Sequence, residues 1–330
     1  VYFADQLEKV AYNALPATIA PDWRSHQYDQ KVNQVKCSQE PRPLYNNGEE
    51  SNLFGLEPNF GCCTANMHQG WPKFVTSMWM QKGEDTLVAV AYGPNELLHE
   101  FENGKGVRIL QETDYPFAGK IEFHIETEQP TSFNLMLRIP AWAGGAAVQK
   151  NGSELSGVVA DEFFTVRGDW QSGDTVTLTL PLELRVTKWF NQSAAVERGP
   201  LLFALPIKER WIDLPERSID RDPQAKQAGF LDFAVHPQSD WNYALHLAEG
   251  NVVIQEVRGY ELGTQPFSPQ TPPVEIIVAA KTIKSWKESG GNTTLIPSSP
   301  VVPDGEGMTP IQLIPYGGTN LRIAQFPWFE

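Results

Sequence analysis

Apolar residues recur at helical spacing in two segments near the start of the chain. Between residues 1 and 15 they occupy positions 3, 7, 10, 11, 14 and 15, which predicts a helix that Pro16 helps to end. A second helical pattern covers residues 64–81. Its apolar stripe consists of Met67, Trp71, Phe74 and Met78. Gly70 and Pro72 interrupt this pattern, so we expect two short helices or one kinked helix, with Pro72 near a first turn.

From Asp85 onward the pattern changes to short, strand-like runs. These runs cover residues 87–92, 107–110, 120–125, 133–139, 163–166, 176–180, 195–205, 252–257, 274–279 and 309–314. Asn-Gly and Gly-Asp pairs separate several of them and are typical of turns. Many short strands at regular spacing predict antiparallel β-sandwich domains.

The change of pattern predicts three domains. Residues 1–84 are expected to hold helices and a long polar loop, residues 85–207 a β-sandwich, and residues 208–330 a second β-rich domain. The helical part is too small to bury a stable core alone. We therefore expect it to pack on the sandwich, or to be the remainder of a larger helical domain that precedes it.

Composition and charge narrow the possible partners. The 330 residues are 41% hydrophobic and carry a formal charge of −14, which argues against nucleic acid and favours a neutral or modestly charged substrate. No apolar run approaches the ~20 residues that span a bilayer, so no membrane partner is expected.

The first residue is Val1, so we expect a segment of a longer protein. Extracellular, periplasmic and cytoplasmic locations all stay open.

Two of the three cysteines, Cys62 and Cys63, are adjacent. Neighbouring cysteines rarely form a disulfide with each other, which leaves metal ligands, a reactive nucleophile or two small apolar residues as interpretations. They directly precede the second helical pattern, where we expect the helix start to lower a thiol pKa. Cys37 could join them as a third metal ligand across the loop.

Polar and aromatic residues after the cysteines are typical of a sugar-binding wall. Asn66 and His68 could bond hydroxyl groups while Trp71 covers an apolar ring face, although a lone histidine is more often structural. The segment from His26 and Gln27 to Cys37 is rich in amides, which suits either polyol recognition or a solvated loop. Glu8, in the first helix, is expected to be a surface charge.

Several stretches together resemble the β-L-arabinofuranosidases of glycoside hydrolase family 127 and their relatives. The similar stretches are residues 3–15, 33–37, 52–63, 111–117, 138–142, 196–200 and 314–323. The Cys62–Cys63 run is the most specific of them. The resemblance implies the last helices of an (α/α)6 barrel followed by β-sandwich domains, with the amino-terminal part of the barrel missing.

The resemblance also implies a mechanism. Cys62 is similar to the family's thiolate nucleophile and Cys63 to its partner zinc ligand, in a retaining hydrolysis of plant-polysaccharide sugars. The family's Glu-x-Cys zinc ligands and its acid/base glutamate have no counterpart in this sequence. We therefore expect this chain to be inactive alone.

Two other interpretations stay open. The chain could be a carbohydrate-binding or structural β module with vestigial cysteines. It could also belong to a zinc-dependent hydrolase that uses metal-bound water, in which case replacing Cys62 with Ser would retain some activity.

Overall fold

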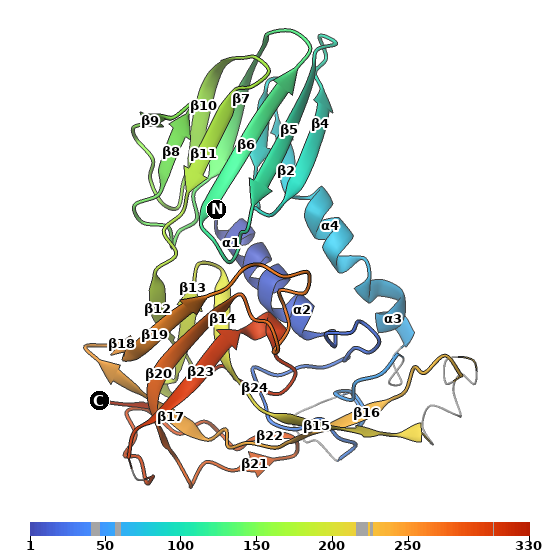
Figure 1. The fold of residues 1–330 in the computed structure, drawn as a ribbon, viewed down its shortest axis with the longest axis vertical. Coiled ribbons are helices and arrows are strands. Elements are labelled where there is room, and N and C mark those ends of the chain that lie inside the picture. The colour runs from blue at the N-terminus through green and yellow to red at the C-terminus, as the bar shows by residue number, and fades with distance from the viewer. Residues whose placement is uncertain (41–46, 57–60, 216–223, 225–226, 306) are drawn as a thin grey trace. The chain divides into compact units, whose positions relative to one another are not determined.

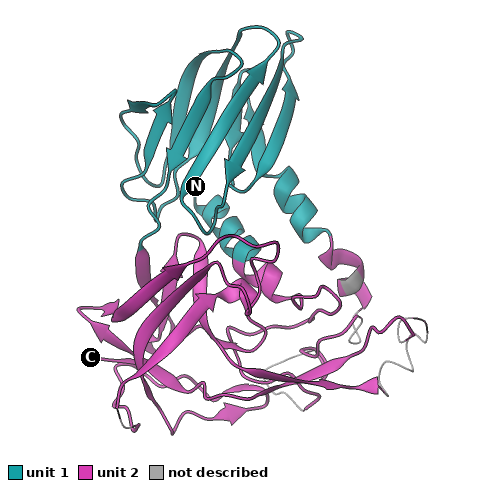
Figure 2. Ribbon diagram, viewed as in Figure 1, with its two compact units in different colours: residues 1–12, 69–183 teal, residues 13–68, 184–330 magenta. Residues whose placement is uncertain are grey.

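A computed structural model describes residues 1–40, 47–56, 61–215, 224, 227–305 and 307–330. The chain divides into two compact units (Figure 2). Unit 1 comprises residues 1–12 and 69–183, and unit 2 comprises residues 13–68 and 184–330. The first 84 residues contribute to both units, so this division crosses the boundaries of the three domains predicted from the sequence.

The first helical pattern forms α1 (Tyr2–Lys9), a π-helical turn η1 (Val10–Ala14) and α2 (Leu15–Ala17). The helix was therefore predicted correctly, but its end and its buried face were not. Pro16 does not end the helix, because it lies in the first turn of α2, where a proline is tolerated. The side chains of Ala4, Glu8, Ala11 and Tyr12 are buried, whereas Phe3 is 85% exposed. The buried face of α1 is the one that carries Glu8, because the Glu8 carboxylate has buried partners. The face that carries Phe3 is therefore exposed to solvent.

The second helical pattern forms two short helices, α3 (Gly61–Met67) and α4 (Gly70–Thr76), as predicted. Pro72 lies in the first turn of α4, where its missing N–H has no intrahelical partner to lose. The pattern was predicted to continue to residue 81. It ends earlier because Trp79–Lys82 forms the first strand of a sheet, β2.

The partial helical barrel is not supported. Among the described residues the longest α-helix, α1, has eight residues, and the architecture is dominated by strands (Figure 1). Short amphipathic stretches cannot distinguish a barrel helix from a helix that packs against a sheet, because both bury one face. Among the same residues no helix is long and apolar enough to cross a membrane.

Unit 1 is a sandwich of two sheets. Its strands are β2 (Trp79–Lys82), β3 (Thr86–Ala89), β4 (Asn95–Glu100), β5 (Gly106–Thr113), β6 (Lys120–Thr127), β7 (Thr131–Arg138), β8 (Ala147–Lys150), β9 (Ser153–Leu155), β10 (Phe163–Trp170) and β11 (Thr175–Thr179). One sheet has the order β10-β7-β3-β2 and the other β4-β5-β6-β11-β8-β9. All neighbours are antiparallel except β3 and β7.

Alternating burial creates the core of unit 1. Both β5 and β6 bury every second residue, which is the period of a strand with one face on a core. The rings of Trp79, from the four-stranded sheet, and Phe123, from the six-stranded sheet, lie 5.9 Å apart. Phe133 stacks on the fully buried Trp170, with ring centroids 5.2 Å apart. The contact between Trp79 and Phe123 joins the two sheets and confirms the predicted β-sandwich.

Unit 2 holds a large sheet and a separate two-stranded sheet. The strands of the large sheet are β1 (Asn33–Gln34), β12 (Leu184–Lys188), β13 (Ala194–Arg198), β14 (Leu201–Pro206), β17 (Tyr243–Ala248), β18 (Asn251–Val252), β19 (Ile254–Gly259), β20 (Val274–Thr282), β21 (Glu288–Ser289), β22 (Asn292–Thr293), β23 (Thr309–Pro315), β24 (Arg322–Ile323) and β25 (Trp328–Phe329). β15 (Glu209–Asp213) pairs with β16 (Phe233–Pro237). Two 3-10 turns complete the unit, η2 (Phe190–Gln192) and η3 (Tyr316–Gly318).

The amino-terminal loop of unit 2 joins the large sheet through β1. Asn33 pairs with Ile323 of β24, and Gln34 pairs with both Arg322 and Asn292. This short strand fixes the segment that follows α2 between two strands from the far end of the sequence. Pairings over such sequence distances cannot be read from local pattern, and β1 was not predicted.

Candidate active site

The adjacent cysteines are the second and third residues of helix α3. Both are free thiols, and their sulfur atoms lie 3.8 Å apart. The Cys62 side chain is exposed, whereas that of Cys63 is partly buried. The two sulfurs therefore form one small thiol pair, in which Cys62 is the member that an external reactant can reach.

The predicted lowering of the thiol pKa is wrong for Cys63. Burial raises the pKa of Cys63 to about 11, and the hydrogen bond and negative charge of Cys62 add to the rise, as does the charge of Asp29. A helix of seven residues offers a weak dipole, which these effects outweigh. Cys63 is thus a protonated thiol at neutral pH unless a cation stabilises its thiolate.

The three residues of the predicted sugar-binding wall have different surroundings. Asn66 is exposed, and its side-chain amide donates to the Cys62 carbonyl at 2.7 Å. His68 is exposed as well. Trp71 belongs to unit 1, where its ring lies 6.1 Å from Phe74 and 6.2 Å from Tyr12. The structure therefore ties the Asn66 side chain to the backbone of Cys62, not to the thiols, and places Trp71 in an aromatic cluster.

His26 and Gln27 lie inside unit 2. His26 is 3% exposed, and its Nε2 is 2.9 Å from the Leu56 carbonyl. Gln27 is 1% exposed and donates to the Asn52 carbonyl at 2.6 Å and to Cys37 Sγ at 3.2 Å. The contacts of His26 and Gln27 stabilise the polar loop that contains Cys37, Asn52 and Leu56. Their assignment to substrate binding stays a prediction, and their placement does not support it.

Cys37 is a buried thiol of the same amide network. Its backbone pairs with Val235, and Gln27 contacts its sulfur atom. Gln27 also accepts a hydrogen bond from Gln34 at 3.0 Å, and Gln34 donates in turn to the Asn320 carbonyl at 2.8 Å. Gln27 thus links the Cys37 thiol to Gln34, so the amide-rich composition that suggested a sugar site serves the interior of the loop.

A second group of functional interest lies in unit 1 and was missed by the sequence analysis. Glu8 and Arg138 are both fully buried and form an ion pair. Arg138 also binds Asp5 and donates to the Val90 carbonyl. Glu8 accepts from the Tyr92 amide at 2.8 Å and from the Tyr115 hydroxyl at 2.6 Å. The expectation that Glu8 is a surface charge is therefore wrong.

The spacing of Glu8 from the small residues of the first helix could have revealed that Glu8 is buried. Glu8 lies four residues after Ala4 and three before Ala11, so it shares their buried helix face. Burial alone would lower the pKa of Arg138, but the charge of Glu8, its hydrogen bond to Arg138 and the nearby Tyr115 and Tyr92 together outweigh burial and raise it. Burial and the Glu8 charge raise the pKa of Tyr115 and of Tyr12 well above the usual value of 10.0. We call Asp5, Glu8, Arg138 and these tyrosines, with Tyr92, the Glu8 network.

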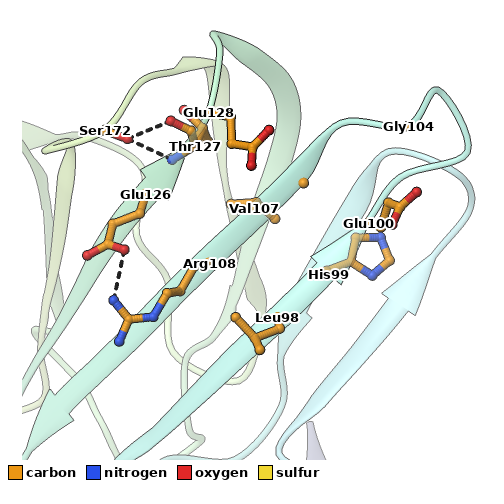
Figure 3. Close-up of a pocket in the computed structure, with 11 residues that line it drawn as sticks. Leu98, His99, Glu100, Gly104, Val107, Arg108, Glu126, Thr127, Glu128 and Ser172 are labelled. Carbon is orange, nitrogen blue, oxygen red and sulfur yellow. Dashed lines mark hydrogen bonds and ion pairs between the residues drawn. The ribbon is translucent and has the colours of Figure 1, made fainter.

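A polar hollow of about 680 Å³ lies on the six-stranded sheet of unit 1, along β4, β5 and β6 (Figure 3). Arg108 Nη1 is 2.8 Å from Glu126, and Arg108 also binds Glu96. Ser172 and Thr127 exchange hydrogen bonds at 2.7 and 2.8 Å. Because its one arginine is already paired with two carboxylates, this hollow is best described as a solvated sheet face.

Residues 86–182, which form most of unit 1, match the family model for the middle domain of GH127 β-L-arabinofuranosidases. The resemblance to family GH127 is confirmed. No protein with a curated description matches the chain in a sequence comparison. The matched segment carries the sandwich and Arg138 of the Glu8 network, and it does not include the cysteines.

Solved GH127 structures share the fold of the whole chain. A GH127 β-L-arabinofuranosidase from Geobacillus stearothermophilus T6 superposes with a TM-score of 0.62 at 20% identity, over 99% of this chain and 46% of its own. A GH127 β-arabinofuranosidase gives 0.65 at 18%, over 99% and 45%. A structure described as a glycoside hydrolase gives 0.66 at 19%, over 100% and 49%. The chain thus spans about half the length of these proteins.

Zinc, which the GH127 resemblance implies, needs more ligands than the described residues bring together. The thiol pair supplies two sulfur atoms, whereas structural zinc takes four ligands and catalytic zinc three plus a water or substrate. Among the described residues, no group of three or more His, Cys, Asp or Glu side chains could hold a metal ion. Cys37, Cys62 and Cys63 therefore do not form such a group, and these residues alone do not fit zinc.

Proposed function

We propose that this chain is part of a retaining glycoside hydrolase that acts on β-L-arabinofuranosides or related plant-polysaccharide sugars, with Cys62 as its nucleophile. The match of residues 86–182 to the GH127 middle domain carries the proposal. The exposed thiol of Cys62 supports its residue assignment, since Cys63 and Cys37 are less accessible.

The proposed reaction has two displacements. Cys62 Sγ attacks the anomeric carbon, the glycosidic C–O bond breaks, and the leaving oxygen takes a proton from a carboxylic acid. A water molecule then attacks the same carbon, gives its proton to the resulting carboxylate and releases the Cys62 thiolate. Two inversions at one carbon produce net retention.

We further propose that the acid and the remaining zinc ligands come from an amino-terminal helical domain outside this chain. The incomplete set of metal ligands and the half-length coverage of the GH127 structures both support this division. Cys63 and Cys62 would then contribute to a zinc site completed by that domain. The isolated chain is accordingly expected to be inactive.

The experiment that tests this function uses the complete protein and a mechanism-based arabinofuranosyl inhibitor. Mass spectrometry is expected to locate one glycosyl adduct on Cys62. Replacing Cys62 with Ser should abolish turnover and the adduct, whereas Cys37→Ser, a matched change of a buried thiol, should keep both. An adduct on a carboxylate, or residual turnover by the Cys62→Ser protein, would contradict the nucleophile assignment.

Metal analysis of the same protein separates the remaining alternatives. The hydrolase should hold about one zinc per active site. A complete protein that holds no zinc and cleaves no arabinofuranoside would instead be a carbohydrate-binding or structural module with vestigial cysteines. Robust turnover by the isolated chain would refute the proposed division of the site.

A further inference from the structure

Unit 2 contains a groove beside the paired strands β1 and β22 and the turn η2. Its volume of about 830 Å³ lies within the range of ~300–1,000 Å³ that is typical of small-ligand sites. We call it the Phe190 groove. Lys31, Val32, Phe190, Thr293, Leu295 and Gln325 are among its lining residues. It shares no residue with the cysteine segment.

Apolar side chains are unusually exposed in this groove. Phe190 is 63% exposed, Leu295 is 79% exposed, and Val32 is 40% exposed. Single exposed apolar residues are ordinary, but here three of them line one groove. The groove therefore offers an aromatic ring and two aliphatic groups to a ligand.

The turn that presents Phe190 is held in an uncommon backbone conformation. Asn191 and Gln192 have φ values of 54° and 56°, a left-handed region that non-glycine residues rarely adopt. The Asn191 side chain donates to the Ile296 carbonyl at 2.9 Å, and the Trp328 indole donates to the Gln192 carbonyl at 2.6 Å. Because these contacts fix the turn, the ring is positioned before a ligand arrives, which lowers the entropy cost of binding.

Hydrogen-bonding groups lie in the same groove. Both amide atoms of Asn33 bind the backbone at Ala324 and Gln325, and so fix the position from which the Gln325 side chain projects. Within the described residues, the side chains of Gln325 and Thr293 have no hydrogen-bond partner. An amide and a hydroxyl can each donate and accept, as sugar hydroxyls do.

The charge of the lining points to an uncharged ligand. Among the described residues that line the groove, Lys31 is the single charged side chain, although the whole chain carries −14. A sugar ring has an apolar C–H face and a rim of hydroxyls, which matches an aromatic ring beside amide and hydroxyl groups. A hydrophobic protein segment would match the ring but would leave these polar groups buried without partners.

We propose that the Phe190 groove binds a neutral oligosaccharide, with one sugar ring on Phe190 and hydroxyl groups bonded to Gln325 and Thr293. Such binding does not depend on glycosidic-bond cleavage at Cys62. It would let the protein hold a polysaccharide chain at a surface where no bond is broken.

The test is isothermal titration calorimetry of the full chain with arabinotriose, xylotriose and cellotriose, and with the anionic trigalacturonate. At least one neutral trisaccharide is expected to bind with a Kd of about 1 mM or tighter. Phe190→Ala should weaken binding about tenfold or more, because the ligand loses an aromatic contact, while Phe190→Tyr should retain it. Phe3→Ala, which removes an even more exposed ring outside the groove, should leave the affinity unchanged.

Several results would overturn the proposal. They are the absence of binding by any neutral trisaccharide, unchanged affinity in the Phe190→Ala chain, or trigalacturonate binding as tightly as the neutral sugars. Loss of binding on Cys62→Ser would place the sugar at the cysteines instead. Sedimentation showing a dimer that Phe190→Ala dissociates, with no sugar binding, would make the groove a contact between copies of the chain.

Discussion

Replacing Arg138 with Met is predicted to destabilise unit 1 strongly. Arg138 and Glu8 are both 0% exposed, and Arg138 also neutralises Asp5. Its removal leaves a buried carboxylate at Glu8 whose remaining partners are the neutral Tyr92 amide and Tyr115 hydroxyl. Removing one partner of a buried ion pair typically costs about 3–5 kcal/mol, because the other charge stays desolvated without compensation. In a domain of this size that loss lowers Tm by roughly 10 °C or more.

The assay is urea and thermal unfolding followed by tryptophan fluorescence, since Trp170 lies in the core of the same unit. Arg108→Met is the matched control, because Arg108 also pairs with two carboxylates but lies on the solvated face. It should leave the midpoint nearly unchanged, since exposed ion pairs contribute little. The double variant Glu8→Leu/Arg138→Met should recover part of the loss. Equal midpoints for the Arg138→Met and Arg108→Met chains would refute the reasoning.

Three further outcomes are expected. Because the folded-state pKa values of the Glu8-network tyrosines are raised above 10.0, their contribution to stability is complete below pH 10 and declines above it. Absorbance at 295 nm should therefore show these tyrosines ionising together with alkaline unfolding, and ionisation in the folded chain would contradict this. A Cβ at Gly119 would lie 2.0 Å from the Leu180 carbonyl oxygen, so Gly119→Ala should lower the unfolding midpoint, whereas Gly144→Ala, in open space, should not. Labelling with a thiol reagent should modify Cys62 first and Cys37 after unfolding, and rapid modification of Cys37 would contradict its burial.

The local pattern of apolar and polar residues was sufficient to predict most helices and strands of unit 1. The alternation in residues 107–110 and 120–125 predicted β5 and β6, because a strand with one face on a core repeats every second residue. The same reasoning found α3 and α4 and the break between them. Local pattern could not predict which face of α1 is buried. An apolar stripe shows that a helix is amphipathic, but it does not show which face packs against the rest of the protein. The paired charges of Asp5, Glu8 and Arg138 decided that orientation.

The sequence by itself determined that this chain forms a β-sandwich and that it resembles GH127, and it singled out Cys62 and Cys63 as candidate site residues. Those features are local or motif-like, so neighbouring residues suffice to reveal them. Tertiary structure alone decided that Glu8 is buried against Arg138, that Gln27 and Cys37 belong to an internal network, and that Phe190 and Gln325 line the same groove. Each of these pairings joins residues far apart in sequence or on faces whose burial depends on what packs against them, and no local pattern encodes such partners.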